Sequence, residues 1–169
     1  MASDKFIAAL IADSPAPGDP NYTLFDPFVG SWSFDLYTYD GGQELLAGRG
    51  EWHFSRILDS RAIQDVWECY TKAEPSVLLE RGTTLRMYDR SRKVWRIVFF
   101  SPMRGFVDTL TANKVADEIV LHGTGRSGSP CLWIFSDIKS DSFQWREEET
   151  PDHGRTWTRL ELMKLTRQR

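Results

Sequence analysis

A histidine and an aspartate stand inside two neighbouring runs of apolar and aromatic residues. His53 lies in the run 50–57 and Asp65 in the run 61–70. A neutral imidazole that faces a pocket can give or take a proton near pH 7. A carboxylate on a buried strand face needs a partner, because an unpaired buried ion is very costly. Both residues are therefore candidates for proton transfer in an enclosed site, unless His53 faces solvent and Asp65 serves only in a structural ion pair.

Arg86 and Tyr88 share one face of the run 83–89. An inward arginine can hold a carboxylate or an enolate through its planar fork of N–H donors. We expect both side chains to point into the molecule and to face Asp65 or His53. The alternatives are a purely structural Asp–Arg pair or simple exposure. The candidate catalytic residues are thus His53, Asp65, Arg86 and Tyr88.

A second set of residues is expected to contact a bound molecule rather than react with it. Aromatic side chains of this kind line sites for apolar ligands, and the set is Trp52, Arg96, Phe100, His122, Trp133, Trp145, Glu147 and Trp157. Some members have a structural alternative. His122 lies on the more polar face of its strand, which favours exposure, and Glu147 opens a run of three glutamates that is typical of a solvated strand end. Trp145 and Trp157 flank the turn 150–155 and could form a cross-strand pair in the core.

Sequence motifs for cofactor chemistry are absent. The chain has no GxGxxG or Walker sequence for nucleotides, and no HExxH or CxxC for metals. Its three histidines are scattered, so the sequence proposes no metal site. Cys69 and Cys131 each lie in an apolar or aromatic run and are expected to be buried thiols.

The charge and composition exclude several classes of protein. With 21 Lys+Arg against 24 Asp+Glu the net charge is −3, which is too little positive charge for nucleic-acid binding. No apolar run approaches the roughly 20 residues that span a bilayer, so no membrane partner is expected. The chain is rich in aromatics instead, with 10 Phe, 7 Trp and 5 Tyr among 169 residues. Such residues favour strands and line pockets for small apolar molecules.

Strands must position these side chains, because runs of aromatic and β-branched residues alternate with turn residues from position 30 onward. No helical segment long enough for a parallel crossover lies between the runs, so the sheet should be antiparallel. A sandwich is the alternative, but closure removes exposed strand edges. We predict an all-β protein, a closed antiparallel up-and-down β-barrel of about ten strands. The predicted strands are 31–39, 50–57, 61–70, 77–80, 83–89, 93–100, 105–111, 117–123, 131–138 and 142–149, with a closing run at 155–167; 77–80 can merge with its neighbour.

The first residues are expected to form a short helix. Four apolar residues between positions 6 and 11 recur at helical spacing, with Ser3 as the N-cap. A Pro/Gly-rich connector, 14–20, follows. The predicted organisation is 1–27 for the helix and connector and 28–169 for the barrel, with the helix covering a barrel mouth. Asp4 argues against the rival interpretation of a signal peptide, so a cytoplasmic location is expected.

The first predicted strand opens on Gly30-Ser31-Trp32. This Gly-x-Trp resembles the first-strand signature of lipocalin-type barrels, the calycin superfamily. The segments GEWHFSRILDSRAIQDVWE (50–68), RGTTLRMYD (81–89) and DSFQWREEETPDHGRTW (141–157) resemble bacterial lipocalin-like proteins of largely unassigned function, with nitrobindin and the fatty-acid-binding proteins as distant relatives in fold. The resemblance implies a barrel with an internal pocket for a small, mainly apolar molecule. Nitrobindin-like proteins bind haem through a histidine near the C-terminal strand; here His153 lies in a turn, so that ligand is not carried over.

Three functions are compatible with such a barrel. It binds a small apolar or aromatic molecule, or it is a cofactor-independent enzyme (lyase, isomerase or cyclase) acting on one, or it binds haem or nitric oxide. The fold does not choose among them, because function resides in the site. The expected partner is a small-molecule ligand or substrate, with a homodimer as the one protein assembly left open. No cofactor is expected apart from the haem alternative.

Overall fold

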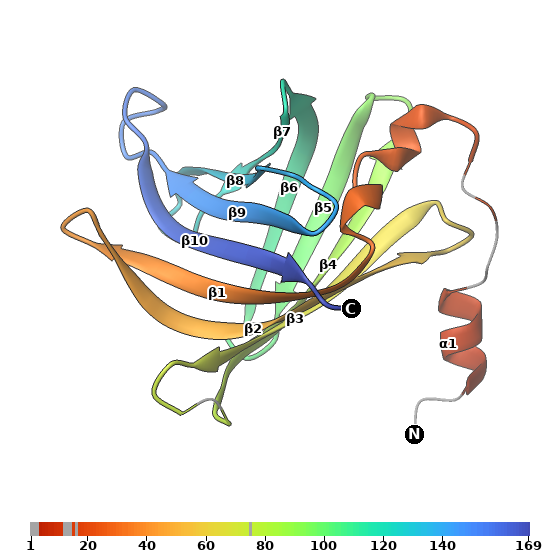
Figure 1. The fold of residues 1–169 in the computed structure, drawn as a ribbon. Helices are drawn as coiled ribbons and strands as arrows, with labels where there is room; N and C mark the ends of the chain where they lie inside the picture. Colours follow the sequence, from red (N-terminus) through yellow and green to blue (C-terminus); the bar gives the residue numbers. More distant parts are fainter. Residues whose placement is uncertain (1–3, 12–14, 16, 75) are drawn as a thin grey trace.

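The computed structural model describes residues 4–11, 15, 17–74 and 76–169 (Figure 1). Ser3, the expected N-cap, lies outside the described residues. The predicted runs 77–80 and 83–89 belong to one strand, β4. The elements are α1 (Asp4–Leu10), the 3-10 turns η1 (Pro20–Thr23) and η2 (Asp26–Phe28), and the strands β1 (Gly30–Asp40), β2 (Gln43–Ile57), β3 (Ala62–Thr71), β4 (Leu78–Asp89), β5 (Val94–Ser101), β6 (Phe106–Val115), β7 (Glu118–Thr124), β8 (Pro130–Ser136), β9 (Ser142–Glu149) and β10 (Thr158–Arg167).

The ten strands close into an antiparallel barrel. Each strand pairs with its neighbours in the chain, and β1 pairs with both β2 and β10. Closure therefore leaves the sheet without a free edge. The predicted fold class is confirmed.

Successive turns lie at opposite ends of the barrel because the strands alternate in direction. One end carries the turns β1–β2, β3–β4, β5–β6, β7–β8 and β9–β10, and the first and last of these lie at the left of Figure 1. The other end carries the remaining turns together with η1 and η2, at the right of the same view. We call the first the open end and the second the closed end.

Aromatic side chains fill the closed end. Phe25 and Phe28, from the segment that contains η1 and η2, are fully buried. Phe28 packs against Phe135 and Phe143, with ring centroids 4.7 Å apart in both pairs. Trp32 is also fully buried, and its indole N–H donates to the Phe28 carbonyl oxygen at 2.7 Å. Trp32 therefore belongs to the core of the closed end.

Helix α1 lies beside the barrel rather than over a mouth (Figure 1). None of its residues is buried, and the Leu10 carbonyl oxygen accepts from the backbone N–H of Leu58 in the β2–β3 turn at 2.9 Å. The expectation that this helix covers a barrel mouth is wrong. The physical reason is that Phe25 and Phe28 already occupy the closed end. None of the described helices is long and apolar enough to cross a membrane.

The two cysteines are buried, as expected. Cys69 lies on β3 and Cys131 on β8, and neither forms a disulfide. Burial raises the pKa of both thiols to about 12. Because the thiolate is the nucleophilic form, these residues stay unreactive at neutral pH.

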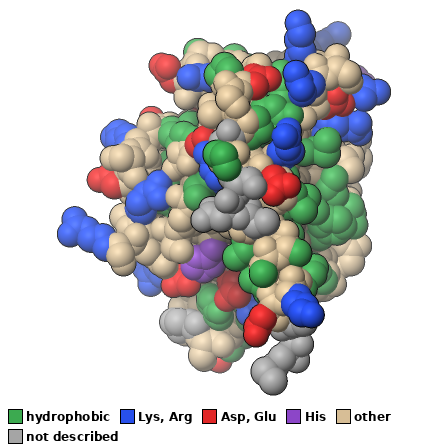
Figure 2. Space-filling view, turned by 90° about the vertical axis from the view of Figure 1, so that its right-hand side faces the viewer, with side chains coloured by type: hydrophobic (Ala, Val, Ile, Leu, Met, Phe, Trp, Pro, Cys, Tyr) green, Lys and Arg blue, Asp and Glu red, His purple; other side chains and the backbone are tan. Residues whose placement is uncertain are grey.

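Apolar side chains also lie on the outside of the barrel. Leu85 and Met87 on β4 and Val107 on β6 are exposed. Figure 2 shows hydrophobic side chains gathered along one flank of the molecule. Exposed apolar surface is typical of interaction sites, but a homodimer stays a prediction.

Candidate functional site

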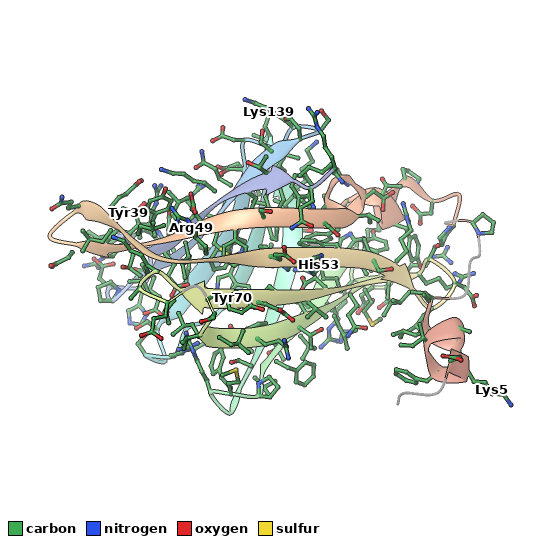
Figure 3. All side chains as sticks on the ribbon, turned by 60° about the horizontal axis from the view of Figure 1, so that its bottom comes forward. Lys5, Tyr39, Arg49, His53, Tyr70 and Lys139 are labelled. Atoms are coloured by element: carbon green, nitrogen blue, oxygen red, sulfur yellow. The ribbon has the colours of Figure 1, made fainter. Side chains whose placement is uncertain are left out.

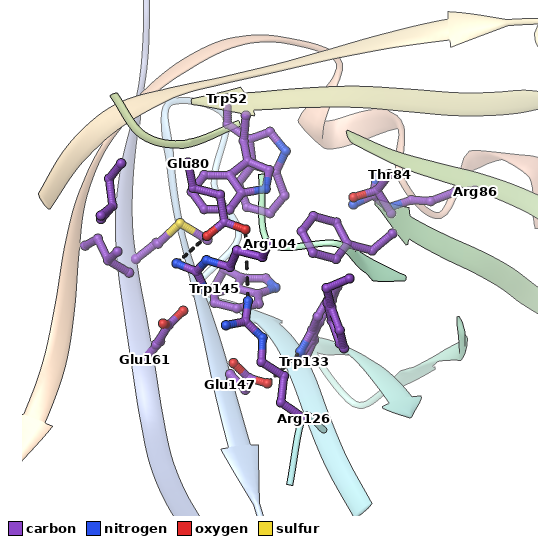
Figure 4. Close-up of a pocket in the computed structure, with 16 residues that line it drawn as sticks. Trp52, Glu80, Thr84, Arg86, Arg104, Arg126, Trp133, Trp145, Glu147 and Glu161 are labelled. Carbon is purple, nitrogen blue, oxygen red and sulfur yellow. Dashed lines mark hydrogen bonds and ion pairs between the residues drawn. The ribbon is translucent and has the colours of Figure 1, made fainter. Parts of the chain in front are cut away.

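A cavity lies inside the open end of the barrel (Figure 4). The space that the centre of a water molecule can occupy there is about 70 Å³. One water needs at least about 10–15 Å³ of such space, so the cavity has room for about five waters or for one small organic group. Its walls are aromatic: Trp52, Trp67, Phe99, Phe106, Trp133 and Trp145.

The indole rings form a packed wall. Trp133 meets Trp145 edge on, with centroids 5.6 Å apart, and meets Phe99 at 5.4 Å. Trp52 lies 6.3 Å from Trp145. On β4, a Cβ at Gly82 would lie only 2.7 Å from the Phe99 ring. The glycine therefore lets the aromatic wall approach β4 closely. Three of the aromatic residues that were expected to contact a ligand, Trp52, Trp133 and Trp145, do line the cavity.

A buried ion pair forms the inner end of the cavity. Arg86 Nη1 donates to Asp65 Oδ2, and Asp65 Oδ1 also accepts from the backbone N–H of Thr84 at 3.1 Å. Arg86 is only 1% exposed, and its guanidinium carbon lies 5.2 Å and 5.3 Å from the ring centroids of Phe25 and Phe54. The expectation that Arg86 points inward and faces Asp65 is confirmed. The pair separates the aromatic closed end from the cavity.

A second charged cluster lies at the mouth. Glu80 of β4 is buried, accepts a hydrogen bond from the Ser101 hydroxyl and forms an ion pair with Arg104 of the β5–β6 turn. Arg126 of the β7–β8 turn lies 4.0 Å from the same carboxylate. Both arginine side chains are partly exposed and stand on turns. Both arginines therefore reach the cavity from outside the sheet.

Two further carboxylates stand opposite each other on β9 and β10. Glu147 is the register partner of Glu161, and both line the cavity. The Trp133 indole N–H donates to Glu147 Oε1 at 3.2 Å. Burial, helped by the Glu161 charge, raises the pKa of Glu147 to about 7, and burial also raises the pKa of Glu161. The pair therefore keeps a proton near neutral pH, and Glu147 does not belong to a solvated strand end.

His53 lies on the outer face of β2 (Figure 3). Its ring Nδ1 is 2.9 Å from Ser31 Oγ, and Nε2 is 3.2 Å from a Glu51 carboxylate oxygen. Trp52 and Phe54, the alternate residues of β2, are the buried ones. The structure therefore does not bring His53 to the cavity, in agreement with the solvent-facing alternative.

Arg96 and Phe100 also face outward. On β5 the buried residues are Trp95, Ile97 and Phe99. Whichever face of β5 pointed inward, apolar side chains would be buried, but only the observed orientation leaves the Arg96 charge in water. The inward orientation considered for Arg96 and Phe100 is wrong.

His122 and Trp157 lie outside the cavity as well. His122 is exposed on β7, and Trp157 is 39% exposed in the β9–β10 turn. Trp145 pairs in register with Met163, so the expected pair with Trp157 does not form. The Asp152 carboxylate accepts from two backbone N–H groups of this turn, which lowers its pKa to about 2. The motif that contains Asp152 and Trp157 therefore builds a turn.

Tyr88 points inward, as expected, but at the closed end. Its ring lies 5.5 Å from Tyr22 and 6.0 Å from Trp95. It borders a hollow of about 840 Å³ beside η1. This hollow is larger than the cavity at the open end, but it is open to solvent and its charged lining residues are at the surface. We therefore place the candidate site in the enclosed cavity, where burial strengthens polar contacts.

Four charged lining residues were not predicted from the sequence: Glu80, Arg104, Arg126 and Glu161. Once 77–80 and 83–89 are joined into one strand, Glu80 falls in the same inward row as Arg86, which is a usable signal. Arg104 and Arg126 lie in turns, where strand parity gives no orientation. Glu161 follows a register shift on β10, which breaks the simple alternation.

No protein-family model matches the chain, and no curated protein matches it. Solved structures with a similar fold include Rv2717c from M. tuberculosis, with a TM-score of 0.60 and 14% identity over 89% of this chain and 99% of that chain. The S-type phycobiliprotein lyase CPES from Guillardia theta has a TM-score of 0.57 and 14% identity over 86% of this chain and 90% of that chain. At this identity the likeness concerns the fold, which is a lipocalin-like barrel.

The donor groups of the cavity do not fit haem. Histidine, cysteine or tyrosine holds haem iron, with methionine as a second ligand beside histidine; among the described lining residues only Met163 belongs to this set, and it has no histidine beside it. His153, the histidine nearest the C-terminal strand, stands exposed in the β9–β10 turn with a φ of 60°. The described residues also contain no cluster of metal-ligating side chains. We therefore derive no chemistry through haem.

Proposed function

We propose that this protein binds a small, mainly apolar or aromatic molecule in the cavity at the open end. One observation carries the proposal: four indole rings enclose a space that also holds charged groups. Binding sites of this kind combine an apolar wall with a few polar groups that orient the ligand. The shared fold of CPES, a phycobiliprotein lyase, is compatible with a barrel that handles a small molecule.

The charges support this proposal because folding does not need them there. Glu147 and Glu161 face each other across β9 and β10, and neither makes an ion pair among the described residues. Both residues are half-buried, and placing two partly buried carboxylates beside each other lowers stability. Such groups are commonly kept for function rather than for the fold.

A paired substitution tests the proposal after native mass spectrometry of freshly purified protein has shown what is bound. The probe is 2-acetyl-6-(dimethylamino)naphthalene, whose fluorescence depends on the polarity around it. Trp145→Ala removes an indole inside the cavity, and Trp157→Ala removes one outside it. We expect Trp145→Ala to weaken dye binding about fivefold, since one aromatic contact is worth about 1 kcal/mol, and Trp157→Ala to leave it unchanged. Equal effects of the two variants, or no dye binding by the wild type, would contradict the proposal.

A second candidate function is acid–base catalysis on the bound molecule, as in a lyase or isomerase. The observation that favours it is a carboxyl with a pKa of about 7 inside an aromatic cavity, because a general acid works best when its pKa is near the ambient pH. In this version Glu147 donates the proton and Arg86, with Asp65, orients the substrate. His53 and Tyr88 have no part in it, because they lie outside the cavity.

Chromatography with mass detection separates the two candidates. The co-purified molecule is released, incubated with wild type or with Glu147→Gln, and analysed again. A change in the molecule that wild type causes and Glu147→Gln does not would favour the enzyme. An unchanged molecule would leave binding as the function.

Four other expectations stay predictions: membership of the calycin superfamily, the division at residues 27 and 28, the cytoplasmic location and a homodimer.

A further inference from the structure

Two buried N–H groups of residues that line the cavity have no acceptor among the described residues. They are the indole Nε1 of Trp52 and the Nε of Arg86. Trp52 is 4% exposed and Arg86 is 1% exposed, and both line the cavity. Buried donors without a partner are rare in folded proteins, because each lost its hydrogen bonds to water on folding. Two of them in one cavity indicate that something else supplies the acceptor.

Other indoles of the chain show the contrast. The N–H of Trp32 donates to the Phe28 carbonyl oxygen and that of Trp95 donates to the Asn21 carbonyl oxygen. Trp133 donates to Glu147. The fold thus provides acceptors for these three buried indoles, whereas the N–H of Trp52, which also lines the cavity, is left without one among the described residues.

The outer part of the cavity presents carboxyl groups rather than unpaired N–H donors. Glu147 and Glu161 present carboxyl oxygens there, and Arg104 and Arg126 are both directed at Glu80. Figure 4 shows these groups around the mouth, away from Arg86. Beyond the indoles a ligand would therefore meet the carboxyl groups of Glu147 and Glu161, which no described arginine or lysine pairs with.

The balance of charges in the cavity further limits the chemical class of the ligand. Asp65 neutralises Arg86, so an additional anion at the inner end would have to lose its water without a free positive partner. A neutral carbonyl oxygen does not carry that cost. At the mouth, three carboxyls face two arginines, and the raised pKa of both Glu147 and Glu161 brings the group closer to neutral. A weakly basic or neutral N–H group suits that place.

We propose that the ligand is a flat aromatic or conjugated molecule with a carbonyl oxygen at one end and an N–H group at the other. The carbonyl oxygen accepts from Trp52 and Arg86 at the inner end, and the N–H group donates to Glu147 or Glu161 at the mouth. This inference rests on the proposed binding function and adds the direction in which the ligand lies.

Three matched probes test it by fluorescence or calorimetric titration. 2-Acetyl-6-aminonaphthalene carries both groups, 2-acetyl-6-(dimethylamino)naphthalene lacks the N–H, and 2-amino-6-ethylnaphthalene lacks the carbonyl. The corresponding aniline derivatives test a shorter span. We expect the complete probe on at least one scaffold to bind about tenfold more tightly than either incomplete one, the factor that one well-placed hydrogen bond provides.

Variants then assign each end. Trp52→Phe keeps an aromatic ring but removes the N–H, so it should abolish the preference for the carbonyl and keep the preference for the amine. Glu147→Gln should reduce only the preference for the amine. Trp157→Phe makes the same change as Trp52→Phe outside the cavity and should alter neither preference. Circular dichroism at the titration temperature checks that each variant is folded.

The possible failures are distinguishable. If no probe binds to wild type, the proposed binding function fails and the inference falls with it. If all three probes bind equally well, binding stands but the direction of the ligand is wrong. If the complete probe is preferred and Trp52→Phe leaves that preference intact, the inner donors are satisfied by water alone and the assignment of the carbonyl is wrong.

Discussion

The two ends of the barrel use the same residue type in different ways. At the closed end, Trp32 is fully buried and its N–H is bonded to a backbone oxygen of η2. At the open end, Trp52 is nearly as buried but its N–H has no partner in the described chain. The closed end is a dry aromatic plug, whereas the open end mixes indoles with five charged side chains. The difference teaches that the two ends are packed by different rules: the first end satisfies its buried indole N–H groups, whereas the second leaves that of Trp52 unsatisfied, which fits the proposed binding function.

The largest expected effect is at the closed end. Trp32→Ala should lower the free energy of unfolding by about 3–5 kcal/mol, because a fully buried aromatic ring leaves a cavity when it is truncated. Urea denaturation measures the loss. A loss below about 1 kcal/mol would mean that the closed end does not hold the barrel together, and the comparison would break.

The ion pair between the two ends comes next. Asp65→Leu should cost about 3 kcal/mol, because it leaves the Arg86 charge buried without its partner. The double variant Asp65→Leu, Arg86→Leu should recover most of that loss. If the double variant is as unstable as the single one, the pair supports the fold and is not held for the site. Arg86→Leu alone should also destabilise, since it strands the buried Asp65.

The carboxyl groups of the open end should make the stability of the protein depend on pH. The pKa of Glu147 is about 7 in the fold against an ordinary value of 4.5, so its contribution to stability is fully present below pH 4.5 and is lost as the pH rises through 7. Glu147→Gln should therefore be more stable than wild type at pH 8, by about 1–2 kcal/mol, and should lose this advantage near pH 4. Glu148→Gln is the matched control, because its carboxylate pairs with Arg146. A gain in Glu148→Gln equal to that in Glu147→Gln would count against the buried pair.

The smallest effect is expected on the outer wall. His53→Ala removes contacts with Ser31 and Glu51 that are close to solvent, and partly exposed pairs of this kind contribute about 0.5 kcal/mol or less. Stability and dye affinity should both stay near the wild-type values. A large loss of dye affinity would return His53 to the site and overturn the placement of the cavity.

The alternation of inward and outward side chains along a strand explains how much of the site could be predicted from the sequence. On β4, the row of Thr84, Arg86 and Tyr88 has one clear orientation once a partner for Asp65 is required, and the structure has that orientation. On β5, both faces carry apolar residues and only the charge of Arg96 distinguishes them, so the expectation of an inward arginine led to the wrong face. The closed end was missed for another reason: Phe25 and Phe28 lie in the short segment that contains η1 and η2, which carries no periodic pattern. Arg104 and Arg126 were missed because they reach the cavity from turns.

Indole N–H signals in a nitrogen–proton NMR spectrum test the central claim most directly. The chain has 7 Trp, and each gives one such signal. Trp52, Trp67, Trp133 and Trp145 line the cavity, whereas Trp32 and Trp95 belong to the closed end and Trp157 to a turn. On addition of 2-acetyl-6-aminonaphthalene, the signals of the four cavity indoles should shift, that of Trp52 furthest, while the other three stay in place. Shifts confined to Trp95 or Trp157 would contradict the account, because they would put the binding site at the closed end or on the surface.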